Sequence, residues 1–336
     1  MQKPFLISII SKLAPHVGAT VSIEPEFGCI GLLTFRNGKR SVFHWTGLDI
    51  NPQGAMYLAR DKGYTSHFLK LFGYNVPEGM PFFCNNLCHK LNVKKGIHDG
   101  YLYAQKMGFP IVVKPNDLSQ GALVAKVYNK REYYRAARLI FRETQVLLVQ
   151  KHYTGRDYRV VIFDKELVTA YERIPFTIIG DGKSTIATLI NERLELLSQQ
   201  RPINTDTAGN PRIRAKLTRL HKTPEDVLEK GYQLVLLDNA NLSTGGEAID
   251  ITDKIHPSFS DLAISITNDL GLRLCGVDIM TGDLSMPLDQ QSNGYIVIEV
   301  NGAPSMDNYA ALGTRQAHVV DKLFLRILRA MENDPA

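Results

Sequence analysis

Hydrophobic and polar residues alternate along this chain with two different periods. Segments with a period of about 3.6 residues predict helices, and segments with a period of about two residues predict strands. The N-terminal part predicts a short helix, followed by strands over residues 20–23, 29–35 and 41–45. Asn37-Gly38 lies between the last two strands, and an Asn-Gly pair between apolar runs is typical of a β-hairpin turn. The first 49 residues therefore predict a small region that contains both helix and strand.

A helical pattern over residues 52–72 comes next, and Gly73 and a turn at 76–79 bring it to an end. Helices and strands then alternate as far as residue 163. The expected elements are a helix from Asp99, a strand over 111–113 ending in Lys114-Pro115, a loop over 116–121, a strand over 122–128, a helix over 130–142 with its apolar face on Tyr134, Ala137 and Ile140-Phe141, and strands over 145–150 and 158–163. This order predicts an α+β or mixed α/β architecture.

Residues 198–222 differ from the rest of the chain in having weak periodicity and many Arg, Asn, Thr and Pro residues. We expect a long surface loop there. Loops of that length in compact enzymes are uncommon and tend to be either functional lids or disordered segments.

Composition places the chain among folded globular proteins, since 44% of its 336 residues are hydrophobic and 22% are charged. The length favours one enzyme built from interlocked subdomains, because a single core stops growing at roughly 250 to 300 residues. A formal charge of +5 suits anionic ligands. The basic residues are dispersed among acidic ones, which argues against nucleic acid as a partner.

Cysteine usage and hydropathy indicate a cytoplasmic protein. Four scattered cysteines are too few for a disulfide framework, and no apolar segment is long enough to span a membrane. The N-terminal apolar run is short and lacks the features of a signal peptide. Cys84, Cys88 and His89 lie close together, but no fourth ligand is near them in the sequence, which favours ordinary thiols over a zinc site.

Two apolar strands near the C-terminus carry isolated polar side chains. In the strand over 295–301, Glu299 and Asn301 should point the same way as Val297, because side chains alternate between the faces of a strand. Asp278 is the single acid in the apolar run over 274–279. Carboxylate and amide oxygens of this kind are the ligands that Mg²⁺ prefers. Surface ion pairs at strand ends are the alternative interpretation.

Lys114 ends a hydrophobic strand and precedes a loop that contains Ser119, Gln120 and Gly121. An ammonium group beside a glycine-containing loop can bind phosphate oxygens, although a lysine at a strand end is more often simply solvated. Lys62 begins or lies within a helix and is uninformative by itself.

Longer motifs, in a fixed order over residues 59–309, resemble those of the ATP-grasp superfamily. The likeness is greatest to the ATP-grasp portion of cyanophycin synthetase, and D-alanine:D-alanine ligase and glutathione synthetase are of the same type. The motifs are Asp61-Lys62, Gly73, Val76-Pro77-Glu78-Gly79, Gly108 to Pro115, Gly155-Arg156-Asp157-Tyr158-Arg159-Val160, Arg173-Ile174-Pro175, Gly180-Asp181-Gly182, Asn241 to Asp250, Gly276-Val277-Asp278 and Ile298 to Pro304.

The resemblance implies a fold in which a nucleotide is held between two α+β subdomains. Residues 59–336 would form the ATP-grasp domain, with 100–153 as its smaller nucleotide-lid subdomain. Residues 1–58 would form a small N-terminal α/β region.

The resemblance also implies the roles of individual residues. Those implied to bind the nucleotide are Lys62 and Lys114 at the phosphates, Ser119, Gln120 and Gly121 in a lid loop, Gln150, Lys151 and Tyr153 in an adenine-binding hinge, and Asp157 at the ribose hydroxyls. Asp278, Glu299 and Asn301 would hold two Mg²⁺ ions, for which Mn²⁺ could substitute. Arg173, Lys114 and Asn241 would be catalytic, facing the γ-phosphate and the activated carboxylate.

The implied activity is that of an ATP-dependent carboxylate-amine ligase acting through an acyl phosphate. Its expected partners are a small-molecule acid and amine, an amino acid or a peptide, with a homodimer as the oligomer that the resemblance allows. Two departures limit the transfer: the hinge opens with Gln150 where many relatives have Glu, and Ala303-Pro304-Ser305 stands where relatives often have Pro-Gly. A ligase that modifies a ribosomal peptide and a nucleotide-binding regulatory protein remain as alternatives.

Overall fold

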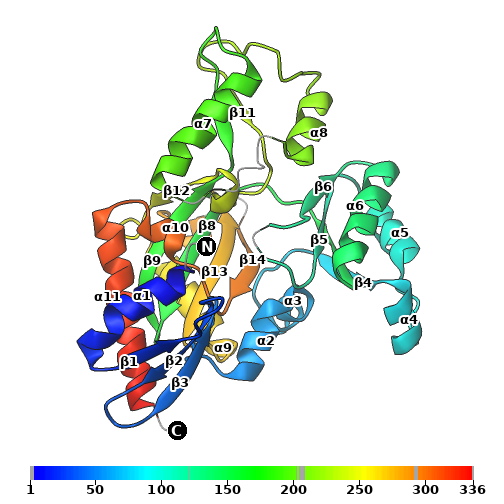
Figure 1. The fold of residues 1–336 in the computed structure, drawn as a ribbon. Coiled ribbons are helices and arrows are strands. Elements are labelled where there is room, and N and C mark those ends of the chain that lie inside the picture. Colours follow the sequence, from blue (N-terminus) through cyan, green and yellow to red (C-terminus); the bar gives the residue numbers. More distant parts are fainter. Residues whose placement is uncertain (1–3, 120, 202, 204–208, 291–293, 335–336) are drawn as a thin grey trace.

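The computed structural model describes residues 4–119, 121–201, 203, 209–290 and 294–334, which form four β-sheets and the helices around them (Figure 1). The helices are α1 (Phe5–Leu13), α2 (Gln53–Arg60), α3 (Lys62–Leu71), α4 (Asn85–Leu91), α5 (Ile97–Met107), α6 (Lys130–Glu143), α7 (Ile186–Gln200), α8 (Pro211–Arg219), α9 (Pro257–Asp269), α10 (Asp307–Ala310) and α11 (Thr314–Asn333), with short 3-10 helices η1 (Ala14–Val17), η3 (Leu242–Thr244) and η4 (Leu288–Gln290). None of the helices within these ranges is long and apolar enough to cross a bilayer.

The strands are distributed over one large sheet and three smaller ones. They are β1 (Thr20–Ile23), β2 (Ile30–Thr34), β3 (Arg40–His44), β4 (Gly79–Phe83), β5 (Ile111–Pro115), β6 (Ala125–Val127), β7 (Val146–Lys151), β8 (Arg156–Phe163), β9 (Glu166–Ile174), β10 (Thr177–Ile179), β11 (Gln233–Val235), β12 (Glu247–Asp250), β13 (Leu274–Thr281) and β14 (Tyr295–Asn301). The mixed architecture predicted from the sequence is confirmed.

The large central sheet is antiparallel, with strand order β12-β9-β8-β13-β14, and hydrophobic cores cover both faces of its middle strand over residues 160–163. Along β8, Val160 and Ile162 pack on α9, whereas Val161 and Phe163 belong to the core shared with α1 and α11. A strand covered on both faces reads as a continuous apolar run, which explains the lack of alternation in this part of the sequence.

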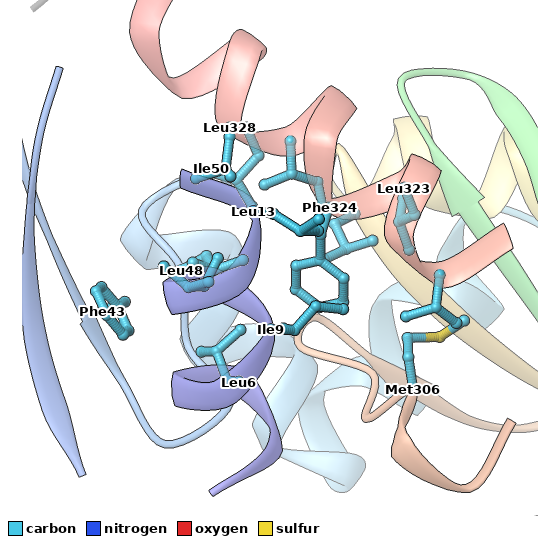
Figure 2. Packing of buried hydrophobic residues seen from close by; sticks show 14 of the residues in the cluster. Leu6, Ile9, Leu13, Phe43, Leu48, Ile50, Met306, Leu323, Phe324 and Leu328 are labelled. Atoms are coloured by element: carbon cyan, nitrogen blue, oxygen red, sulfur yellow. The ribbon is translucent and has the colours of Figure 1, made fainter. Parts of the chain in front are cut away.

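The N-terminal region is attached to the central sheet through helices. Its sheet has the order β1-β2-β3, and α1 lies between this sheet and α11 (Figure 2). Figure 2 shows Leu6 and Leu48 beside Phe43 of β3, and Ile9 and Leu13 turned toward Phe324 of α11. Residues from the two ends of the chain therefore share one core.

A four-stranded sheet of order β4-β7-β5-β6 forms the smaller half of the molecule, at the right of Figure 1. Along β5, Ile111 and Val113 are buried against α5 and α6, so Val112 and Lys114 face the opposite way. The alternation of side chains between the two faces of this short strand thus determines which way Lys114 points.

Two of the predicted helices differ in detail from the structure. The helical stretch over 52–72 is broken at Asp61, whose carboxylate accepts a hydrogen bond from the backbone N–H of Tyr64 at 2.8 Å and so caps α3. In α6, the predicted apolar face included Tyr134, but Tyr134 is only partly buried and its neighbour Tyr133 is fully buried. The buried hydroxyl of Tyr133 donates a hydrogen bond to the carbonyl of Ile97 at 3.0 Å.

The prediction of a continuous loop over residues 198–222 is wrong. Helix α7 continues to Gln200, and α8 occupies Pro211–Arg219, while residues 202 and 204–208 lie outside the described part of the chain. Helix α8 forms because Pro211 suits its first turn and Asn210 caps it, and because Ile213 and Leu217, one turn apart, are buried against α7 and β11.

Candidate active site

A cleft of about 1080 Å³ lies between the small sheet and the central sheet, and α8 forms a third wall. Such a volume is at the upper end for ligand pockets, so the cleft can accommodate more than one ligand. All but one of the residues assigned to the site from the sequence line this cleft. They are Lys62, Lys114, Ser119, Gly121, Gln150, Lys151, Tyr153, Asp157, Arg173, Asn241, Asp278, Glu299 and Asn301. Gln120, the remaining one, lies outside the described residues.

Asp278 and Glu299 are directly opposite each other on neighbouring strands of the cleft floor. Directly opposed side chains in an antiparallel pair have Cβ atoms about 5 Å apart. The register of β13 and β14 shifts next to this pair, so that Ile298 is an extra residue in β14. The bulge turns Val297 into the core, and the prediction that Val297 shares a face with Glu299 and Asn301 is wrong.

Two arginines hold the carboxylate of Asp278, which is 2% exposed. Arg159 donates to both of its oxygens, at 2.7 and 2.8 Å, and Arg173 donates to Oδ2 at 2.9 Å. Burial acts to raise the pKa of Asp278, but the two guanidinium groups outweigh it and hold that pKa below its usual value. Asp278 is therefore ionised at neutral pH.

Asp157 is the second carboxylate bound by Arg173. Its Oδ1 accepts from Nε at 2.9 Å and from Nη2 at 2.5 Å. Arg173 thus bridges Asp157 on β8 and Asp278 on β13. The structure places Asp157 in a network of charged residues on the central sheet, and its assignment to the ribose stays a prediction.

Lys62 and Lys114 come from different parts of the fold and both reach the cleft. Lys62, at the start of α3, has its Nζ 3.2 Å from Oε1 of Glu299 and donates to the carbonyl of Leu118 at 2.7 Å. Lys114 is 6% exposed. Burial and, to a lesser extent, the charge of Lys62 lower the pKa of Lys114 to about 8, although Glu299 and Asp278 act in the opposite direction.

Gly121 of the expected lid loop lies against Asn239. Its φ is +66°, a left-handed conformation that favours glycine, and a Cβ there would come within 2.4 Å of the side-chain amide nitrogen of Asn239. The glycine in this motif is therefore required for both backbone conformation and close packing.

Residues 150–153 comprise the last two residues of β7 and the two that follow it, and they line the cleft. Gln150 is buried, and its neighbours in the sheet are Gly79 and Val112. Tyr153 accepts a hydrogen bond through its hydroxyl from the backbone N–H of Glu78 at 3.3 Å. The turn that contains Pro77 and Glu78 thus contacts the expected hinge and stabilises the position of Tyr153.

The loop over 241–246 is tightly folded. Asn241 accepts hydrogen bonds from the backbone N–H and the hydroxyl of Ser243, at 3.0 and 3.1 Å. A Cβ on Gly246 would lie 2.7 Å from the carbonyl oxygen of Asn241. This packing places Asn241 and Ser243 at the cleft wall.

Several cleft residues were not identified as site residues from the sequence. Arg159 lies within a recognised motif, and its spacing to Asp157 on the same strand was the available signal. The basic residues of α8 were missed together with the helix itself. The residues added by the structure are Arg159, Asn239, Arg212, Lys216 and Arg219.

The residues on the cleft floor fit a magnesium site by the chemistry of their donors. Arg159 and Arg173 use three of the roughly four lone-pair directions of Asp278, which leaves one unused by them, and Asp278 lines the cleft. Glu299 lies opposite Asp278, and Asn301 lines the same cleft floor, where its amide oxygen is the atom that could bind a cation. The residues suited to hold such an ion are Asp278, Glu299 and Asn301.

Known proteins resemble this chain at the level of sequence and of structure, although no protein-family model matches it. It is 35% identical over 269 residues to cyanophycin synthetase of Trichormus variabilis, a match that covers 76% of this chain and 27% of that protein. It is 28% identical over 261 residues to the bifunctional glutathione biosynthesis protein of Mannheimia succiniciproducens, covering 74% and 32%.

Among solved structures, the bifunctional glutathione synthetase of Pasteurella multocida matches with a TM-score of 0.55 at 22% identity. The match covers 92% of this chain and 42% of that one, and it shows a shared fold. The chain spans about a third or less of the length of the curated relatives named above.

Proposed function

Since the chain belongs to the ATP-grasp superfamily, we propose that it is an ATP-dependent ligase that joins a carboxylic acid to an amine. The observation that carries the proposal is the pairing of Asp278 with Glu299 on the floor of a cleft that Lys62 and Lys114 also line. Carboxylates for a metal ion and lysines for phosphates are the groups that phosphoryl transfer requires.

In this proposal the nucleotide lies between the two sheets. Lys62 and Lys114 bind its phosphates, residues 150–153 receive the adenine, and Asp157 binds the ribose. Asp278, Glu299 and Asn301 hold Mg²⁺, two ions by the family resemblance, and the metal supplies neutralisation of phosphate charge. Residues 59–336 then form the catalytic unit, with 100–153 as its lid side and 1–58 as an attached region.

The reaction has two steps. A carboxylate oxygen of the acid attacks the γ-phosphorus, the bond to the bridging oxygen breaks, and ADP leaves. The amine nitrogen then attacks the acyl carbon, phosphate leaves, and the amine loses a proton to give the amide. Arg173 and Asn241 face the transferred group and orient it, and closure of the loop around Gly121 excludes water that would hydrolyse the acyl phosphate.

We propose an amino acid or a peptide as the substrate, because the names of the relatives are those of enzymes that make glutathione and cyanophycin. Free cytoplasmic metabolites would fit beside a nucleotide in a cleft of this volume. A ribosomal peptide would need additional contacts, for which residues 1–58 are the candidate. Thr46, next to β3, lines the cleft and shows that this region reaches it.

A screen of amino-acid pairs tests the proposal. We expect ADP and phosphate to be released in equal amounts only when a suitable acid and amine are both present, with an amide of the summed mass less water. Nucleotide binding without turnover for any pair would contradict the proposal and favour a regulatory nucleotide-binding protein.

Lys114 makes ATP affinity dependent on pH. Its pKa of about 8 in the free protein means that it is charged at pH 7 and mostly neutral at pH 9. The phosphates bind the charged form, so the Kd for ATP should rise about tenfold between these pH values. Calorimetric titration at both pH values measures it. In Lys114→Arg, whose charge persists, the rise should be absent; an equal rise in both proteins would contradict the role of Lys114.

A further inference from the structure

Helix α8 presents a basic face to the cleft. Arg212, Lys216 and Arg219 are spaced by one helical turn and line the cleft, whereas Ile213 and Leu217 are buried in the core beneath. Arg214 on the same helix is exposed and does not line the cleft. The helical spacing of these residues therefore determines which cations of α8 face the cleft.

Two of these three cations already have a carboxylate partner. Lys216 lies 2.6 Å from Asp238, and Arg219 lies 3.5 Å from Glu132 and over the ring of Tyr128. Both of these cations therefore have a carboxylate of the protein as a charged partner.

Arg212 differs from them, because the structure gives it only neutral oxygen partners among the described residues. Nη1 donates to the carbonyl of Gly121 at 3.3 Å and to Oδ1 of Asn239 at 3.4 Å, and Nε donates to Oδ1 of Asn210 at 3.3 Å. Burial lowers the pKa of Arg212, and the charge of Asp238 opposes this. A half-buried guanidinium without a carboxylate is poised for an anion.

Asn239 adds a second donor at the same place. Its Nδ2 is buried with no hydrogen-bond partner, and it lies next to Gly121 at the cleft wall. Buried polar atoms rarely lack a partner in native proteins, and a ligand oxygen would provide one. Arg212 and Asn239 therefore bring a planar guanidinium and an amide N–H to one position.

We propose that Arg212 and Asn239 form a carboxylate-binding subsite, which selects an acid substrate bearing a second carboxylate. This inference rests on the proposed ligase function. A planar guanidinium donating beside an amide matches a planar carboxylate. In the proposed function, Lys62, Lys114 and Arg173 bind the γ-phosphate, so Arg212 is not needed for it. Lys62 and Arg212 contact different residues of the lid loop, since Lys62 donates to the carbonyl of Leu118 and Arg212 to that of Gly121.

Matched acids test the subsite, with hydroxylamine as the amine so that an acyl phosphate is trapped as a hydroxamate. The pairs are L-aspartate with L-asparagine and L-glutamate with L-glutamine, which differ in one charge. We expect the wild-type protein to prefer a dicarboxylate, and Arg212→Gln to raise the KM for it roughly 10- to 100-fold while leaving the KM for ATP unchanged. Arg214→Gln, on the exposed side of α8, should behave as wild type.

The outcomes separate the subsite from the function. Equal use of charged and neutral acids, or a raised KM for ATP alone in Arg212→Gln, would overturn the subsite while the ligase stands. If none of the tested acids gives a hydroxamate, the result would count against the ligase function. In that case equilibrium dialysis of L-aspartate against the protein with ADP decides: binding lost in Arg212→Gln supports the subsite, and equal binding of L-asparagine contradicts it.

Discussion

Replacing Glu299 with glutamine is expected to lower the turnover number by roughly two to three orders of magnitude, while the protein stays folded. The substitution keeps the shape of the side chain and removes one of the two charges that face each other on β13 and β14. It also removes the ion-pair partner of Lys62, 3.2 Å away. A neutral amide binds a divalent ion more weakly, so activity should recover in part at high magnesium concentration.

Steady-state ADP release over a magnesium titration measures this effect. Glu166→Gln is the matched control, since Glu166 forms an exposed ion pair with Arg326 at 2.7 Å on the far end of β9. It should keep wild-type activity. Near-normal turnover of Glu299→Gln at low magnesium would show that Glu299 has no role in metal binding.

Replacing Asp278 with asparagine is expected to affect both stability and activity. Asp278 is the carboxylate that neutralises Arg159, and both groups are nearly buried. Removing one partner of a buried pair leaves the other charge uncompensated, which costs about 3 kcal/mol in the free energy of unfolding. For a chain of 336 residues the melting temperature should fall by roughly 4 °C, and turnover should be lost with the expected metal ligand.

Differential scanning calorimetry measures the change in stability, and a double variant controls for it. Arg159→Met combined with Asp278→Leu removes both charges and should recover much of the lost stability. Glu299→Gln should melt within about 2 °C of wild type because Glu299 is partly exposed and its pair is weak. An unchanged melting temperature for Asp278→Asn would mean that the arginines are satisfied without it.

The local sequence pattern was sufficient to predict the structure where a single strand or turn determines it. Side chains alternate between the faces of β5, so Lys114 lies on the cleft side, next to the loop over 116–121 that made it a candidate phosphate-binding lysine. The hairpin at Asn37-Gly38 formed between β2 and β3 as predicted. In both cases a few neighbouring residues carry the whole signal.

Register was not accessible in the same way. Asp278 and Glu299 are 21 residues apart in the sequence, and their pairing depends on the extra residue Ile298 in β14. A bulge reverses the faces of a strand, so strict alternation gave the wrong side for Val297. The family resemblance predicted from the sequence that the two acids share one site.

Helix α8 was missed because its apolar signal consists of two residues, Ile213 and Leu217, within a basic segment. So short an amphipathic pattern becomes a helix only when α7 and β11 provide a surface for it. The cleft role of Arg212 could not be inferred without that packing. Similarly, the contact of Arg159 with Asp278 depends on the pairing of β8 with β13, which places the two residues opposite each other.

Oxygen-18 in the carboxylate of the acid that supports turnover tests the central claim most directly. If the acid attacks the γ-phosphorus and the amine then displaces phosphate, each phosphate released carries one oxygen from the carboxylate. Mass spectrometry of the phosphate should therefore show one heavy atom per molecule, in proportion to the amide formed. Phosphate that carries no label, released while amide forms, would contradict an acyl phosphate and with it the proposed reaction.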